Sequence, residues 1–144
     1  MYDFGECGAK VNDRKIVVKE NKRKFIIDNP NNLTILKVKV DDCLDIPGKK
    51  CDWLLITLNE QAAHFVELKG NKIEHALLQL GNAIKVISEP AQAFIESKFS
   101  KIFAYAILSH CPIDSTEIQN KKIYFRRKLN AILEIKNKSI TKAF

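Results

Sequence analysis

Several features are scarce in this sequence of 144 residues, and each shortage narrows what the protein can be. No apolar run approaches the ~18 residues that a membrane-spanning helix needs, and the N-terminus lacks the apolar stretch of a signal peptide. Glycine and proline are few, and no Gly/Ser-rich linker divides the chain. We therefore expect one cytoplasmic domain over residues 1–144 that is neither secreted nor inserted in a membrane.

Cysteine is present but lacks the spacing that is typical of metal sites. The four cysteines are Cys7, Cys43, Cys51 and Cys111, and none of them forms a CxxC or CxxxC pair. Such pairs supply most structural zinc sites. In a cytoplasm that keeps thiols reduced, free and mostly buried cysteines are the expectation. The cysteines therefore predict structural roles rather than a zinc centre.

Acidic residues are almost missing from one end of the chain. Residues 1–118 hold 16 acidic and 16 basic side chains, whereas residues 119–144 hold 8 basic side chains and a single acidic one, so the net charge of +7 belongs to the last segment. Five of these cations fall on an expected helix, and they are Lys121, Lys122, Arg126, Arg127 and Lys128. Cationic side chains bind phosphates without reading base sequence, which makes the five a candidate nucleic-acid-binding patch. A solvated helix face is the alternative interpretation.

Hydrophobic patterning predicts a mixed sheet with two helices. Strands are expected over residues 15–19, 24–27, 33–40, 52–58, 63–68 and 101–109. An apolar stripe with helical spacing predicts an amphipathic helix over residues 72–88. A second helix is expected from Asp114 or Ser115 to about residue 128. Residues 131–135 and 139–141 are expected to close the chain as a hairpin.

One short stretch has residues suited to catalysis. Residues 66–70 read VELKG, which places Glu67 and Lys69 on one face of a strand because side chains alternate. The predicted hairpin places Asp52 opposite about residue 68, beside this pair. Two carboxylates and the Leu68 carbonyl are oxygen ligands suited to Mg²⁺, and an adjacent ammonium can hold an attacking water. The alternatives are a solvated surface ion pair and a turn aspartate.

These residues resemble the PD-(D/E)XK nuclease superfamily. The resemblance lies in Cys51-Asp52 at the start of a strand, Glu67-Leu68-Lys69 on the next strand, and the helix that follows, which together cover roughly half of the chain. It implies that Asp52 and Glu67 bind Mg²⁺ or Mn²⁺ and that Lys69 serves the catalytic water. It also implies an α/β fold with a restriction endonuclease-like mixed β-sheet flanked by helices.

The same resemblance points to residues outside the two strands. Some branches of the superfamily carry a glutamine on the helix after the ExK strand, and Gln79 lies at the edge of the apolar stripe, where it could face the site. Many members also carry a glutamate on an N-terminal helix. Glu6 and Glu20 are the nearest candidates for that position, although no helix is predicted before residue 15.

Two histidines and the single tryptophan lie close to these residues in the sequence. His64 lies on the second strand of the predicted hairpin, and His75 lies on the helix face opposite the apolar stripe, so both are expected at the surface. Trp53 alternates with Leu55 and is expected in the core rather than as a stacking platform for a base.

The sequence therefore predicts a metal-dependent nuclease that hydrolyses phosphodiester bonds of DNA, or of RNA. Small enzymes of this fold commonly act as dimers, so the resemblance implies a homodimer in which two sites cut two strands. One alternative is a catalytically inactive module of the same fold that binds nucleic acid or a protein partner. Another is a small interaction protein, such as a toxin inhibitor, in which the ExK sequence is coincidental.

Overall fold

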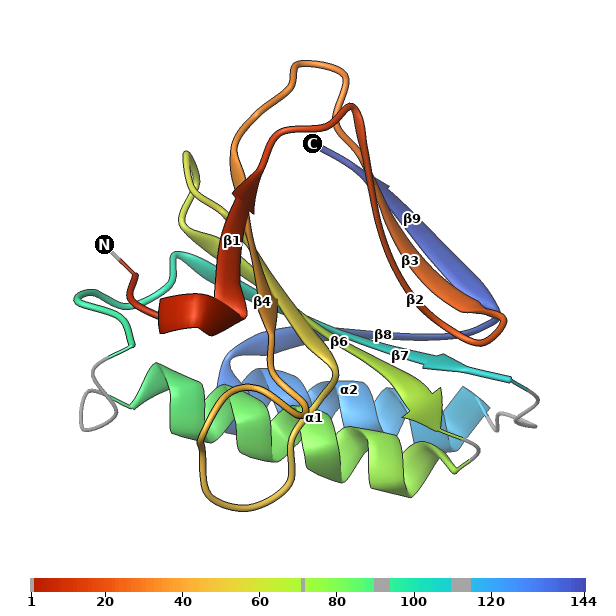
Figure 1. Ribbon diagram of the computed structural model, residues 1–144. Coiled ribbons are helices and arrows are strands. Elements are labelled where there is room, and N and C mark those ends of the chain that lie inside the picture. The colour runs from red at the N-terminus through yellow and green to blue at the C-terminus, as the bar shows by residue number, and fades with distance from the viewer. Residues whose placement is uncertain (1, 71, 90–93, 110–114) are drawn as a thin grey trace.

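The computed structural model describes residues 2–70, 72–89, 94–109 and 115–144, which form two sheets and two long helices (Figure 1). The larger sheet has the strand order β1 (Gly8–Val11), β4 (Ile35–Lys39), β5 (Trp53–Thr57), β6 (Ala62–Gly70), β7 (Lys101–Leu108) and β8 (Ala131–Asn137). The smaller sheet has the order β2 (Lys15–Glu20), β3 (Arg23–Asp28) and β9 (Ser139–Ala143). The helices are α1 (Ile73–Ser88), α2 (Ser115–Leu129) and the short 3-10 turn Gly5–Cys7. None of the described helices is long and apolar enough to cross a membrane.

The larger sheet is mixed because its second half is built by helical crossovers. β4, β5 and β6 form an antiparallel meander, as expected for strands joined by short links. α1 then carries the chain back so that β7 lies parallel to β6, and α2 does the same between β7 and β8. This confirms the mixed α/β class, the predicted hairpin of residues 52–58 and 63–68, and both predicted helices.

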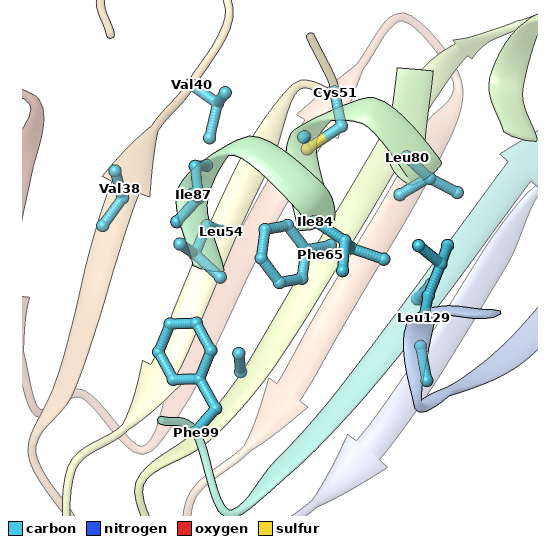
Figure 2. Close-up of a cluster of buried hydrophobic side chains, with 14 of the residues drawn as sticks. Val38, Val40, Cys51, Leu54, Phe65, Leu80, Ile84, Ile87, Phe99 and Leu129 are labelled. Carbon is cyan, nitrogen blue, oxygen red and sulfur yellow. The ribbon is translucent and has the colours of Figure 1, made fainter. Parts of the chain in front are cut away.

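Both faces of the larger sheet are covered. α1 and α2 lie on one face, and the smaller sheet lies on the other (Figure 1). The apolar stripe of α1 is buried as predicted, with Ile84 near Phe65 and Ile87 near Leu54 of the sheet (Figure 2). In the described part of the chain, the helices that flank the larger sheet therefore lie on one of its faces. Continuous burial on both faces explains why β5, the first part of β6 and β7 are apolar at nearly every position.

The space between the two sheets holds a second core. Its members come from both sheets and include Phe25 and Ile27 of β3, Val66 and Leu68 of β6, and Ile140 of β9. All five side chains are at least 98% shielded from solvent. Because Ile140 belongs to the last strand, this core draws the end of the chain onto the sheet face opposite the helices.

The predicted closing hairpin is wrong. β8 pairs in parallel with β7 of the larger sheet, whereas β9 pairs in parallel with β3 of the smaller sheet. Lys138 links the two sheets: its N–H donates to the Leu108 carbonyl, and its own carbonyl accepts from the N–H of Lys24. Its φ of 72° turns the chain from one sheet to the other. Alternation identified both strands, but it carries no information about which strand each one pairs with.

The expectation that all cysteines are free thiols is also wrong. Cys7 and Cys43 form a disulfide with Cα atoms 5.7 Å apart, whereas Cys51 is free and buried. Antiparallel pairing of β1 with β4 brings the turn before β1 close to the loop after β4. Since this pairing was not predicted, the proximity of the two cysteines could not be. Cys111 lies outside the described residues.

We expect reduction of this disulfide to destabilise the protein. The bridge joins residues 36 positions apart, and restricting a loop of that length in the unfolded chain contributes about 4 kcal/mol to the free energy of unfolding. Guanidinium unfolding with and without reductant measures the difference. A Cys7→Ser/Cys43→Ser variant is the control and should be insensitive to reductant. Equal midpoints for the oxidised and reduced wild type would contradict the expectation.

Candidate functional site

The pairing of β5 with β6 brings the two predicted carboxylates to the same level. Trp53 lies opposite Val66, so Asp52, just before β5, is level with Glu67 rather than with residue 68 as expected. The N–H of Asp52 donates to the Val66 carbonyl at 3.1 Å, which departs from the regular ladder. The carboxylate of Asp52 accepts the N–H of Leu68 at 2.6 Å through Oδ2. Asp52 is therefore bound to β6 by both its backbone and its side chain.

Both carboxylates are removed from solvent. Glu67 is 0% exposed and Asp52 is 2% exposed. The solvated surface alternative is therefore wrong for Glu67, and the turn alternative for Asp52 is wrong because its carboxylate reaches across to β6. Lys69 continues β6 two residues after Glu67, but its side chain lies outside the described part of the structure.

Gln79 on α1 lies beside Glu67. With its amide nitrogen turned towards the strand, Gln79 donates to Oε2 of Glu67 at 2.9 Å and to the His75 carbonyl at 3.1 Å. The apolar stripe of α1 holds the helix on the sheet, and Gln79 projects from the edge of that stripe. The structure therefore joins Asp52, Glu67 and Gln79 from two strands and one helix.

The pKa of the free Cys51 thiol is affected by the two carboxylates of this site. Burial raises the pKa of Cys51 well above its ordinary value, and the negative charges of Glu67 and then Asp52 raise it further. The Cys51 Sγ lies 3.6 Å from the carbonyl of Trp53, to which the thiol donates. The Cys51 thiol therefore stays protonated beside the two carboxylates.

The donor set of the site suits a hard divalent cation. Mg²⁺ is usually held by one or two carboxylates and completes its octahedron with waters and substrate phosphate. Asp52, Glu67 and the Leu68 carbonyl provide such a set. In the described part of the chain, no three His, Cys, Asp or Glu side chains gather as a group that could hold a metal ion, so a cation at this site would have two carboxylate ligands.

The structure does not gather the five predicted cations of α2 on one face. Lys121 lines a groove of about 640 Å³ between α1 and α2, together with Glu74 and Glu117. Arg126 lines a separate hollow of about 230 Å³ beside Lys101 at the start of β7. Lys122, Arg127 and Lys128 occupy other positions around the same helix, because successive residues turn by about 100°.

The end of α2 is also displaced from the carboxylates along the sheet. Arg126 lies next to Ile102, whereas Glu67 is level with Ala106 on the same strand. Four residues of a strand correspond to about 13 Å. The carboxylates and the last turn of α2 therefore occupy different parts of the molecule.

No described contact places Glu6 or Glu20 beside Glu67. Glu6 is exposed in the turn before β1, and β4 and β5 separate β1 from β6. Glu20 ends β2 in the smaller sheet, opposite Arg23, whose guanidinium donates to the Ser109 hydroxyl beyond β7. Glu20 thus lies towards the same end of the molecule as the carboxylates but in the other sheet.

A buried His64–Tyr105 pair was missed by the sequence analysis. His64 is 1% exposed, so the expected surface position is wrong, whereas His75 is exposed as predicted. Nδ1 of His64 lies 3.0 Å from the Tyr105 hydroxyl, and the His64 ring stacks on Phe103. Strand alternation gave the available signal, because His64 shares its face with Val66, which is in the core between the sheets.

We expect His64 to make stability depend on pH. Burial, with a smaller effect from the charge of Lys142, lowers the pKa of His64 from 6.5 to about 3. The unfolded chain therefore binds a proton at His64 more readily than the folded chain does. The contribution of His64 to the free energy of unfolding is constant above pH 6.5. Below that pH it falls by up to about 1.4 kcal/mol per pH unit, until the pH reaches the pKa of the folded state. Urea unfolding between pH 4 and 8 should show a weaker slope for His64→Gln than for the wild type, with exposed His75→Gln as the control. Equal slopes would contradict this.

Comparisons with protein-family models, with curated proteins and with solved structures found no match to this chain. The basis for assigning a function is therefore the set of side chains that the fold brings together. Asp52, Glu67 and Gln79 form that set.

Proposed function

We propose that this protein is a metal-dependent nuclease that hydrolyses phosphodiester bonds of DNA. The observation that carries the proposal is that two fully buried carboxylates, Asp52 and Glu67, come level on adjacent strands while the Gln79 amide binds one of them. Carboxylates are rarely buried together unless cations or hydrogen bonds compensate their charge. Their concentration at one point of an otherwise apolar hairpin is typical of a functional site.

The residues of the site have distinct roles in this proposal. Asp52, Glu67 and the Leu68 carbonyl would hold Mg²⁺ or Mn²⁺, which polarises the phosphodiester and lowers the pKa of bound water. Gln79 fixes the orientation of the Glu67 carboxylate through Oε2. We assign to Lys69 the role of holding the attacking water and offsetting negative charge in the transition state.

The order of the elements supports a restriction endonuclease-like fold. Asp52 immediately precedes β5, the ExK residues belong to β6, α1 follows, and β7 returns parallel to β6. This is the β-β-α-β order that the resemblance implied. A homodimer would place two such sites on the two strands of a duplex, and this part of the proposal rests on the resemblance alone.

One observation favours the alternative of a catalytically inactive module. The Asp52 carboxylate already accepts a hydrogen bond from the Leu68 N–H, so it supports the end of the β5–β6 ladder whether or not a metal binds. In that alternative the fold binds nucleic acid or a protein partner, and the two carboxylates have a structural role.

Cleavage assays distinguish the two. Supercoiled, linear and branched DNA are incubated with Mn²⁺ and the wild type, Glu67→Gln or Lys69→Ala. We expect each variant to lose about 100-fold or more in rate, because each removes a metal ligand or the group that holds the water. Glu74→Gln on the exposed side of α1 is the matched control and should cleave normally. Absence of cleavage on every substrate, with no Mn²⁺ binding by calorimetry, would exclude the nuclease.

Replacement of Gln79 should have a smaller effect than replacement of a ligand. Groups that orient metal ligands typically contribute 10- to 100-fold to affinity, so we expect Gln79→Ala to weaken Mn²⁺ binding by about tenfold. Calorimetric titration of Gln79→Ala and of Gln119→Ala, an exposed control on α2, provides the comparison. Identical Mn²⁺ affinities for the two variants would show that Gln79 does not position Glu67.

A further inference from the structure

Two lysines of β4 make cation–π contacts with the ring of the single tryptophan. Nζ of Lys39 lies 4.8 Å from the centroid of the Trp53 ring, and Nζ of Lys37 lies 5.0 Å from it. The strand register explains the contact, because Lys39 is paired directly with Trp53 and Lys37 is two residues away on the same face. Trp53 is half-buried against the core between the sheets, so it is neither fully in the core, as expected, nor a free stacking surface.

Among the described residues, no carboxylate forms an ion pair with Lys37 or Lys39. The ammonium groups of Lys37 and Lys39 both contact the Trp53 ring. Since both groups lie near the same centroid, they are at most about 10 Å apart, within the screening length at moderate ionic strength. The indole Nε1–H of Trp53 is buried without an acceptor among the described residues. Two ammonium groups therefore lie close to one aromatic ring, and no described carboxylate is paired with either of them.

The cluster lies at the same end of β5 as the candidate site but on the opposite face of the sheet. Trp53 directly follows Asp52, and the residue after Lys39, Val40, donates its N–H to the Asp52 carbonyl at 3.1 Å. Trp53 packs against the core between the sheets, and the register places Lys37 and Lys39 on the same face as Trp53. Glu67 lies on the other face, where Gln79 of α1 contacts it.

We propose that Lys37, Lys39 and Trp53 form a phosphate-binding platform that holds the DNA backbone at the end of the sheet that carries Asp52, on the face opposite Glu67. Two ammonium groups fixed over an aromatic ring provide charge-assisted donors in a defined position, which is the chemistry that a phosphodiester backbone requires. An apolar side chain would be enough to cover the Trp53 ring. Two cations with which no described carboxylate is paired are instead suited to a polyanion such as DNA. The inference rests on the proposed nuclease function, because it takes DNA as the ligand.

Trp53 supplies a direct measurement, since it is the only tryptophan in the chain. Single- and double-stranded 20-nucleotide DNA is titrated into the wild type in EDTA, so that binding is separated from cleavage. We expect the tryptophan fluorescence to change on binding. Lys37→Ala/Lys39→Ala should bind about tenfold more weakly, with a salt dependence lower by about 1.5 in log–log slope for two lost phosphate contacts.

The matched control is Lys15→Ala/Lys19→Ala, which removes the same charge from exposed positions of β2. If both double variants bind equally, or if DNA binds without changing the fluorescence of Trp53, the platform is excluded. Cleavage with Mn²⁺ separates this outcome from failure of the proposed function. If Lys37→Ala/Lys39→Ala does not change cleavage, the nuclease proposal holds and the platform is excluded. If DNA binding changes the fluorescence of Trp53 but the protein cleaves no substrate, the platform holds and the nuclease proposal is excluded.

Discussion

The antiparallel pairing of β5 with β6 is the constraint on which the rest of the structure depends. Side chains on one face of this hairpin pack under α1, and those on the other face pack under the smaller sheet. Burying each large apolar side chain contributes about 1.5–3 kcal/mol, so both layers are held by this pair. A slip of one residue in β6 would exchange the faces, moving Glu67 into the core between the sheets and Val66 under the helix. Register and site geometry are therefore fixed together.

Much of the hairpin and its site could be predicted because the information is local. Alternation placed Glu67 on the face opposite Val66, and the short link implied antiparallel pairing that brought Asp52 within one residue of its observed level. The one-residue error is the same at every pair of the ladder, from Thr57–Ala62 to Trp53–Val66, so it comes from the length of the link between the two strands. The hydrophobic pattern does not determine how many residues a turn takes up.

The features that could not be predicted all depend on contacts between distant segments. The Cys7–Cys43 bridge requires β1 to pair with β4, and the burial of His64 requires a second sheet over the first. The basic C-terminal segment illustrates the same limit. Lys142 and Lys136 pair with Glu134 at 2.8 Å and 3.8 Å, and the cations of α2 spread around the helix, so a block of charge in sequence is not a patch in space.

The position of β9 has a consequence for how the chain folds. β9 pairs in parallel with β3, so residues 24–28 wait for residues 139–143 before the smaller sheet is complete. Closing a loop of that size is entropically costly, and contacts of such long range form slowly. During synthesis, the smaller sheet therefore lacks its third strand until almost the whole described chain has left the ribosome. Until then one edge of β3 is unpaired, and unpaired strand edges make an incomplete fold prone to aggregation.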